Sequence, residues 1–427
     1  MKIQKYLKAI TVIVAMVAVV PAVAQNAILS LQDCKTLALA QNKKVKMAEA
    51  QLNAAKTAHQ GAQLSSRPSF DASVMGIHVG KPLAQLLPPI IGSTTVAVNQ
   101  PIYTGGKIKL GKEIAAKTVE LFEGQKAMEE TALLLAVENA YWQIVQLKEK
   151  TILARTYQQM LQALCDQLQN AVDAGLTYKN DLLRAKVNLN EAGLNIVKAN
   201  DGLLMAKLSL AQLIGQPNDP SFVISDSMIG NFNELDQSSL DHTADKRPEI
   251  AILKKAIATQ QLQTQLIKAE LKPQIGLSLN GLGTVGKKVN FSTGKDYMFS
   301  YYGMLNVSVP IFDWGKNSKK VKEQQFKVEE KQLQLAEFKE QINLEVQAAW
   351  LQLNQSVKRI NFSAISLQQA EENLKLANDR FTAGTITGKD VLEAQTIWQQ
   401  AYTGSIEAKV AYQINMANYK KAIGELK

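Results

Sequence analysis

The chain presents the same order of sequence features twice, and this duplication constrains its fold more than any single motif. The segment Pro101-Ile102-Tyr103 returns as Pro310-Ile311-Phe312, a shift of 209 positions (310 − 101 = 209). The same shift relates Ile214-Gly215 to Ile423-Gly424. A register kept from residue 101 to residue 215 is typical of helices of matched length, because an insertion would rotate their apolar faces. The sequence therefore predicts one structural unit written twice.

Upstream of these segments the repeat continues at a different spacing. Arg67-Pro68 corresponds to Lys272-Pro273 at a shift of 205 positions (273 − 68 = 205). The change of shift must occur between Pro68 and Pro101, so we predict a loop of variable length in that interval.

The N-terminus has the features of a secretory signal. Lys2, Lys5 and Lys8 precede an apolar run over residues 9–20, and Ala22-Val23-Ala24 forms a cleavage motif. The apolar run is shorter than the roughly 20 residues that span a bilayer as a helix. We predict a signal peptide over 1–24, a first repeat over 25–215, a linker over 216–248 and a second repeat over 249–427.

Charge and reactive residues argue against several classes of function. The formal net charge is +10, or +7 without the three signal lysines (10 − 3 = 7), and the six arginines do not cluster. A nucleic-acid groove would need a concentrated basic stripe, so we expect no nucleic-acid partner. Cys34 and Cys165 are interpreted as two buried thiols rather than one disulfide. His59, His78 and His242 lack metal-binding spacing, and no catalytic or nucleotide motif is present, so we expect no metal, no cofactor and no enzymatic activity.

Each half contains two segments with the period-two alternation of a β-strand. In the first hairpin Phe70, Ala72 and Val74 alternate with polar residues, and a return strand is predicted over 93–103. The second hairpin repeats the pattern over 274–280 and 299–309. An apolar face turned to lipid and a polar face turned to water would form a transmembrane β-barrel. Four strands cannot enclose a lumen, since the smallest such barrels need about 8, so several chains must share the barrel, and a trimer would supply twelve.

Aromatic side chains occur near the predicted strand ends, where an interfacial belt would lie. The alternative is ordinary packing between strands. The candidate interface aromatics are Tyr103, Phe299, Tyr301, Phe312 and Trp314.

Very long helices are predicted after each hairpin. No proline occurs over 107–174 or over 316–383, and 68 residues of helix would extend roughly 100 Å. Apolar residues recur there at steps of three and four, which is the spacing of an antiparallel coiled coil. Each long helix ends at a glycine-containing turn, 174–181 or 383–390, and reverses into a second helix. A shorter helix over 29–65 precedes the first hairpin.

In this order, the elements resemble the TolC-like outer-membrane efflux proteins over essentially the whole mature chain. Two paired motifs carry the resemblance. The strand-to-helix junctions read Pro-Ile-Tyr/Phe-x-x-Gly, from Pro101 to Gly106 and from Pro310 to Gly315. The helix turns read Ala-Gly followed by Asp-x-Leu-x-Ala, over 174–185 and 383–394.

The resemblance implies a mainly helical fold with a small β part. A trimer would form one transmembrane barrel of four strands per chain in the outer membrane and a coiled-coil helical tunnel through the periplasm. It also implies a passive exit duct of a tripartite efflux or type I secretion system, without chemistry of its own. The implied partners are two further copies of the chain, outer-membrane lipid, a periplasmic adaptor and an inner-membrane transporter of the RND, ABC or MFS type. The cargo, whether drugs, metal ions or polypeptides, stays open.

The resemblance also implies roles for the two helix turns, which we call the tips. The adaptor would contact the tip residues Gly175, Leu176, Thr177, Gly384 and Thr385. Acidic residues past the tips would narrow the periplasmic entrance as a gate, here Asp390, Glu393 and Asp181. A simpler role for Asp390 is that of an N-cap or first-turn acid favoured by the helix dipole. The family's best-known gate also uses an arginine where this chain has Ile386. The nearby Arg380 is not aligned with it, so the resemblance does not extend to the locking bonds of the gate.

Two other classes of function compete with the duct. A non-conducting periplasmic coiled-coil scaffold anchored in the outer membrane would explain the helices but not two amphipathic hairpins with aromatic ends. An enzyme with a cryptic site would need a catalytic constellation, and the sequence offers none.

Overall fold

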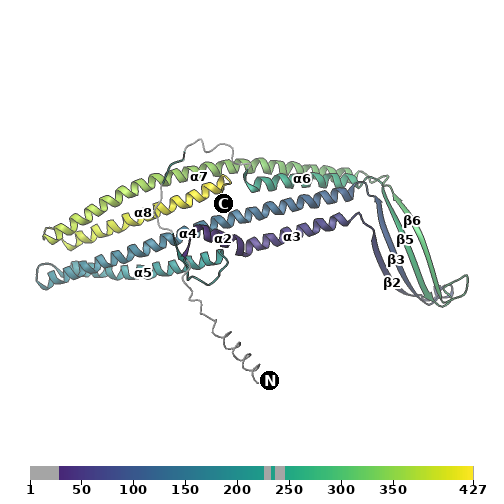
Figure 1. The fold of residues 1–427 in the computed structure, drawn as a ribbon, viewed down its shortest axis with the longest axis horizontal. Helices are drawn as coiled ribbons and strands as arrows, with labels where there is room; N and C mark the ends of the chain where they lie inside the picture. The colour runs from purple at the N-terminus through teal and green to yellow at the C-terminus, as the bar shows by residue number, and fades with distance from the viewer. Residues whose placement is uncertain (1–27, 226–231, 236–245, 427) are drawn as a thin grey trace, which may run out of the picture.

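The computed structural model describes residues 28–225, 232–235 and 246–426. The predicted signal peptide, 1–24, lies outside the described residues. The molecule is elongated, with a long body of roughly parallel helices and a curved β-sheet at one end (Figure 1).

The helices of the two repeats match in length, pair by pair. The long helices have 67 residues each, the returning helices 35 each, and the helices before the hairpins 22 each. Their bounds are α4 (Lys107–Asp173) and α7 (Lys316–Thr382), α5 (Lys179–Leu213) and α8 (Gly388–Ala422), α3 (Lys43–Leu64) and α6 (Pro248–Ala269). The shifts of 209 and 205 positions found in the sequence hold for every pair, which confirms the internal duplication (316 − 107 = 209; 248 − 43 = 205).

The single helix predicted over 29–65 is wrong. The structure has two helices, α2 (Leu31–Gln41) and α3, which are separated by Asn42 in an extended conformation. The Asn42 carboxamide accepts from the Lys44 N–H at 2.8 Å and donates to the Leu213 carbonyl at 2.9 Å. Asparagine side chains compete with the helix for backbone hydrogen bonds, so this residue ends one helix and begins the next.

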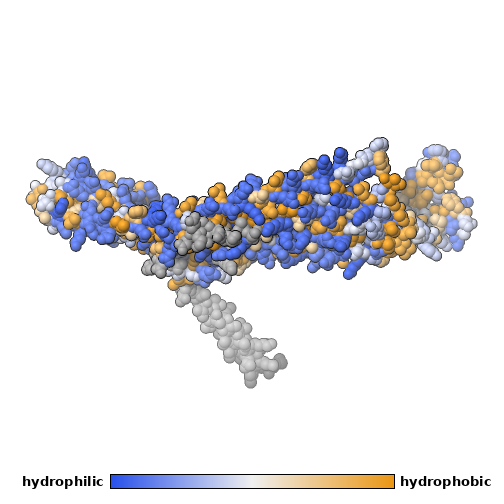
Figure 2. Space-filling model, turned by 90° about the horizontal axis from the view of Figure 1, so that it is seen from above, coloured by the Kyte–Doolittle hydropathy of each residue, from blue (hydrophilic) through white to orange (hydrophobic). Residues whose placement is uncertain are grey.

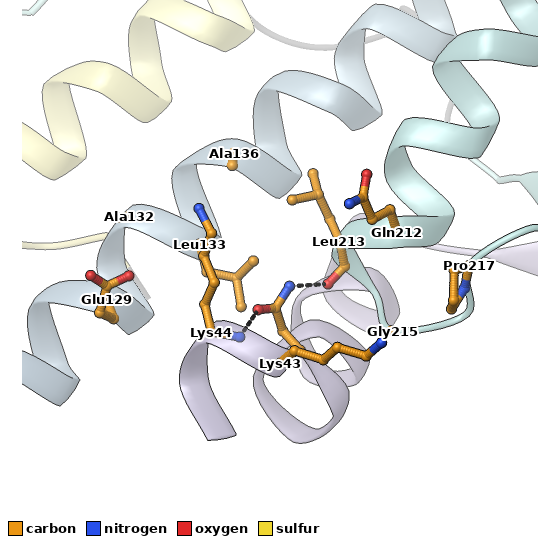
Figure 3. A pocket seen from close by; sticks show the side chains of 11 residues that line it. Lys43, Lys44, Glu129, Ala132, Leu133, Ala136, Gln212, Leu213, Gly215 and Pro217 are labelled. Carbon is orange, nitrogen blue, oxygen red and sulfur yellow. Dashed lines mark hydrogen bonds between the residues drawn. The ribbon is translucent and has the colours of Figure 1, made fainter. Parts of the chain in front are cut away.

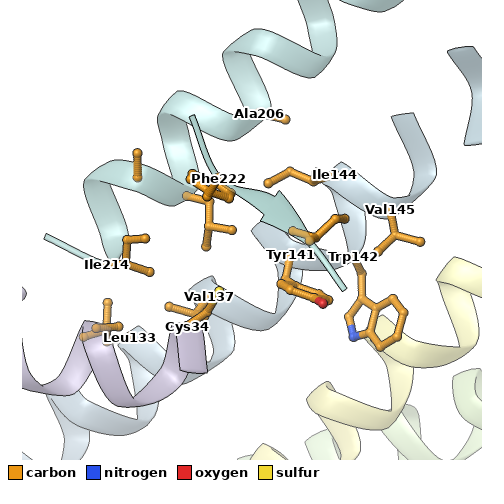
Figure 4. Close-up of a cluster of buried hydrophobic side chains, with 14 of the residues drawn as sticks. Cys34, Leu133, Val137, Tyr141, Trp142, Ile144, Val145, Ala206, Ile214 and Phe222 are labelled. Carbon is orange, nitrogen blue, oxygen red and sulfur yellow. The ribbon is translucent and has the colours of Figure 1, made fainter. Parts of the chain in front are cut away.

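Residues 222–224, which follow the first repeat, pack against the helices of that repeat. Short strand β4 (Val223–Ile224) pairs in parallel with β1 (Ile28–Leu29) near the start of the described chain. Phe222 and Ile224 are buried in the apolar cluster around Tyr141, which Figure 4 shows between α2, α4, α5 and β4. Pro248 is the first residue of α6, so the helix of the second repeat begins one residue before the predicted boundary at 249.

The four long strands form one antiparallel sheet in the order β2-β3-β5-β6. They are β2 (Ser69–His78), β3 (Ile90–Tyr103), β5 (Gln274–Gly286) and β6 (Tyr297–Ser308). A 3-10 turn, Leu83–Gln85, lies in the loop between β2 and β3. The prediction that a loop absorbs the change of repeat spacing is wrong, because β5 has 13 residues where β2 has 10. Three of the four additional residues of the second hairpin therefore lie in β5 (209 − 205 = 4; 13 − 10 = 3).

Strand pairing places the alternating residues on two faces of the sheet, as predicted. Phe70 pairs with Val98, Val98 with Leu279, and Leu277 with Leu305, so apolar side chains share one face. The opposite face carries a hydrogen-bonded row across three strands. The Asn99 amide donates to Asp71 at 3.1 Å, and the Ser278 hydroxyl donates to the Asn99 carbonyl oxygen at 2.8 Å.

A cavity in the first repeat corresponds to a set of ion pairs in the second. About 450 Å³ lies open between α3, α4 and α5, lined by Asn42, Ala136 and Gln212 among others (Figure 3). The repeat shifts relate these three residues to Arg247, Glu345 and Lys421. Arg247 and Lys421 contact Glu345 at 2.5 and 2.9 Å. Larger charged side chains thus occupy the place that smaller ones leave empty.

Candidate functional site

Both tips are built by the same backbone motif at the end of a long helix. Gly175 and Gly384 adopt φ values of +71° and +70°, a left-handed conformation that glycine accepts without strain. The Leu176 N–H donates to the Ala171 carbonyl at 2.8 Å, and the Thr385 N–H donates to the Arg380 carbonyl at 2.9 Å. These bonds close the Schellman motif and satisfy carbonyls that the helix leaves free.

The predicted docking residues form the outer surface of the tips. Gly175, Leu176, Gly384 and Thr385 are exposed, and Thr177 is half-buried. A Cβ atom built on either glycine would have no heavy-atom neighbour within 4 Å. The tips therefore offer room for a partner or for a larger side chain.

The two acids that follow the tips differ in their local bonding. Asp390 is the third residue of α8, where its carboxylate accepts from the Thr387 N–H at 2.9 Å and from the Thr387 hydroxyl at 2.8 Å. Asp181 stands at the matching place in α5, but there the N-cap residue is Tyr178, which has no capping side chain. The structure thus gives Asp390 a first-turn capping role. This is the simpler role that the sequence allowed for Asp390, and the Thr-x-x-Asp spacing is its signature.

These hydrogen bonds also set the charge of Asp390. Donation from the Thr387 backbone and hydroxyl lowers the pKa of Asp390 below its ordinary value of 3.8. Because the carboxylate is favoured in the folded protein, this contribution is present above pH 3.8 and is lost as the pH falls through the lowered pKa.

An open groove of about 460 Å³ brings two of the three gate candidates together with a basic residue, whereas Asp181 does not line it. Asp390 and Glu393 line it from α8, Arg380 lines it from α7, and Ile386 lines it from the tip. Among the described residues no ion pair joins Arg380 to either acid. In the sequence, Arg380 does not align with the arginine of the family's gate. In the structure, the chain reverses at the tip, and Arg380 lines the same groove as Asp390 and Glu393.

The strand-to-helix junctions also share one backbone conformation. Gly106 and Gly315 precede α4 and α7 with φ values of +94° and +76°. The residue before each glycine is left-handed as well, with Gly105 at +65° and Trp314 at +55°. Gly105 has no room for a side chain, since a Cβ there would lie 2.7 Å from Lys272 Cβ. Trp314 is exposed and stacks edge-on against Phe312, with 4.9 Å between ring centroids.

The prolines that begin the two junctions lie differently relative to the strands. Pro101 lies within β3 next to a register shift, which accommodates a residue that cannot donate to the ladder. Pro310 follows the end of β6.

The predicted interface aromatics do not all lie at the ends of the strands. Tyr103, Phe312 and Trp314 lie at the junctions, and Phe299 lies near the opposite end of β6 beside Tyr297. Tyr301 is not at a strand end, because it follows the start of β6 by four positions and pairs with Gly281.

Comparison with known proteins decides the family. The family model for outer membrane efflux proteins matches residues 36–216 and 240–425. The chain belongs to the outer membrane efflux protein family. It is therefore an outer-membrane protein that extends into the periplasm, in a family of channel proteins rather than enzymes.

Individual relatives are distant in sequence. Outer membrane protein TolC of Salmonella enteritidis is 22% identical over 356 residues, 78% of this chain and 69% of TolC. TolC of Escherichia coli K12 is 22% identical over 308 residues, 70% of this chain and 62% of its own length. The crystal structure of CusC, described in terms of transmembrane channel formation, has a TM-score of 0.79 at 16% identity and covers 94% of this chain and 95% of CusC. Family membership thus agrees with the TolC-like resemblance, and the solved structures share the fold.

Proposed function

We propose that this protein is the outer-membrane exit duct of a tripartite efflux or type I secretion system. Three copies assemble side by side, so that their sheets close into one barrel of twelve strands and their helices form one periplasmic tunnel. The tips dock on a periplasmic adaptor, which joins the duct to an inner-membrane transporter of the RND, ABC or MFS type. Substrates pass through without chemistry.

The sheet carries this proposal. Its outer strands, β2 and β6, each have one edge without a strand partner among the described residues. Unpaired backbone groups are costly in lipid, and closure with other copies removes them. The 12 residues of β6 extend about 40 Å, or roughly 30 Å along the membrane normal when tilted as barrel strands are. That height matches the apolar core of a bilayer.

The helices explain how such a barrel would be reached from the periplasm. With 67 residues each, α4 and α7 extend roughly 100 Å from the junctions to the tips. No helix among the described residues is long and apolar enough to cross a membrane.

Conductance distinguishes the duct from the scaffold. Protein purified from outer membranes in detergent is expected to have the mass of a trimer and to give stepwise ion currents in planar lipid bilayers. A protein that forms trimers but never conducts would favour the non-conducting scaffold. A monodisperse monomer that needs no detergent would contradict the architecture as well.

At the proposed gate, we expect Asp390→Ala combined with Glu393→Ala to reduce cation preference in the same bilayers. Three copies would place six carboxylates at the narrow end of the tunnel, where their field attracts cations. In the unmodified protein, preference for cations should persist at pH 5, because the pKa of Asp390 is lowered from 3.8. Unchanged selectivity in the double variant would leave both acids with helix-start roles alone.

The capping bond offers a matched control for this gate experiment. Thr387→Ala removes the hydroxyl that donates to Asp390 but keeps the carboxylate charge. We expect cation preference to survive this substitution if the field of the acids, rather than the shape of the turn, sets selectivity.

A further inference from the structure

The loop that joins β5 to β6 is basic and lies at the end of the sheet remote from the helices (Figure 1). Over residues 287–296 it contains three lysines, Lys287, Lys288 and Lys295, and all three are exposed. The acid of this loop, Asp296, accepts from the Lys288 backbone N–H at 2.7 Å. Among the described residues, none of the three ammonium groups takes part in an ion pair.

Two of these lysines belong to the apolar face of the sheet. Val285 pairs with Tyr297, and the next residue of β5 donates its N–H to the Asp296 carbonyl at 2.9 Å, so the ladder continues into the loop. Strand alternation then assigns Lys287 and Lys295 to the face of Val285 and Tyr297. The Lys295 Nζ atom lies 5.5 Å from the centre of the Tyr297 ring, which places its ammonium group on that face.

The two ammonium groups need a shared counter-charge. Residues opposite each other on neighbouring strands have Cβ atoms about 5 Å apart, and like charges at such positions repel. An anion bound between Lys287 and Lys295 would remove this repulsion. Since no carboxylate of the described chain lies within ion-pair distance of either, the anion would come from another molecule.

An exposed aromatic column continues from these lysines toward the middle of the sheet. Tyr297, Phe299 and Tyr301 alternate along β6 on the same face and are 49%, 81% and 89% exposed. Phe299 and Tyr301 pair with Gly283 and Gly281, so β5 presents backbone without side chains beside the rings. Hydrophobic residues are visible on the sheet at this end of the molecule (Figure 2). The column is long and apolar, which suits a hydrocarbon chain.

The first hairpin has no comparable arrangement. Its strands end at His78 and begin again at Ile90, and the loop between them contains a single lysine, Lys81. That loop instead exposes apolar side chains such as Leu83 and Leu86. The lysine pair above an aromatic column is therefore specific to the second hairpin.

We propose that Lys287 and Lys295 bind the phosphate of a lipid headgroup, and that an acyl chain of the same lipid lies along Tyr297, Phe299 and Tyr301. The proposal rests on the duct proposed above, in which the tips are periplasmic and this loop lies at the outer leaflet. Phosphate oxygens accept charge-assisted hydrogen bonds from ammonium groups, and lysine clusters attract anionic lipids. The column also gives Tyr301, which is not at a strand end, a contact of its own.

Titration of the detergent-solubilised trimer with lipid A, a phosphorylated and acylated lipid, tests this site. We expect one lipid to bind per chain, counted by native mass spectrometry over a series of lipid concentrations. Lys287→Gln combined with Lys295→Gln should weaken this binding about 30-fold, because each lysine near an anionic lipid contributes about fivefold. Unchanged binding by the double variant would overturn the proposal.

Two lysines at the other end of the sheet provide the matched control. Lys316 and Lys319 are exposed in the first turn of α7, close to the strand-to-helix junction. Lys316→Gln combined with Lys319→Gln removes the same charge and should leave the affinity for lipid A unchanged. If both double variants lose affinity equally, the effect is one of net charge and the assigned site is wrong.

The acyl chain is tested separately from the phosphate. Inorganic pyrophosphate has the phosphate chemistry without a chain, so it should displace lipid A only at a concentration at least tenfold higher. Tyr301→Ser should weaken binding of lipid A but not of pyrophosphate. If pyrophosphate competes as well as lipid A does, a free phosphate compound and not a lipid is the occupant.

Trimer mass and conductance of the same preparations separate failure of this site from failure of the duct. Conducting trimers whose affinity for lipid A does not depend on Lys287 and Lys295 overturn the lipid site and leave the duct in place. A monomer that needs no detergent and does not conduct overturns both proposals.

Discussion

Replacing Gly384 by Trp is expected to abolish adaptor docking and export while the trimer and its conductance persist. Gly384 has φ +70°, so any side chain there costs about 1–2 kcal/mol of backbone strain. Nothing lies within 4 Å of its Cβ position, so the indole would project outward from the tip. The membrane end is roughly 100 Å away along α7, which protects the barrel from this change. In-cell crosslinking to the adaptor and trimer yield are measured together.

Gly384→Ala separates the two kinds of damage. Alanine imposes similar backbone strain but adds no bulk to the docking surface. Export by the alanine variant should therefore remain close to that of the unmodified protein. Gly175→Trp tests the other tip, where φ is +71° and the Cβ position is also open. If the Gly384→Trp trimer forms and still captures the adaptor normally, the docking assignment of this tip is wrong.

Replacing Leu279 by Arg is expected to destabilise the assembled barrel by about 2–4 kcal/mol, because an arginine near the bilayer midplane must be removed from water. Leu279 lies in the middle of β5, on the apolar face, and pairs with Val98 and Gly303. The measurements are the free energy of unfolding from lipid bilayers in denaturant and the amount of trimer in outer membranes.

The next residue along the strand provides the matched control. Asn280 pairs with Ala97 and Tyr302 on the opposite, polar face. In the proposed duct the polar face lines a water-filled lumen, so Asn280→Arg would place the same charge in water, where little loss of stability is expected. Equal losses for the two variants would mean that the sheet does not face lipid on one side.

Several features of the fold could be predicted because they are local or periodic. Alternation along a strand has a period of two, so the placement of Phe70 and Leu279 on one apolar face followed from sequence order alone. Helix length followed from the absence of proline and from the repeat, since an insertion would have rotated the buried face. The left-handed tips followed from Gly175 and Gly384, where other residues would be strained.

Predictions that depended on competing local bonds were less successful. The composition over 29–65 favours a helix throughout, but the Asn42 side chain bonds to Lys44 and to Leu213 and divides it. Leu213 is remote in sequence, so half of that arrangement exists only once α5 has folded back along α4. Tyr301 had the residue type of an interface aromatic, whereas the strand register places it away from the strand ends.

By itself, the sequence determined the duplicated order of elements, the faces of the strands and the positions of the turns, because these depend on short-range geometry and on periodicity. Only the tertiary structure decided which distant side chains meet. Helix reversal put Arg380 on the groove of Asp390 and Glu393. Packing made equivalent positions unequal, so that an ion-pair network fills the second repeat where the first has a cavity. Such contacts depend on how whole helices pack against one another. This packing cannot be predicted from a short stretch of sequence.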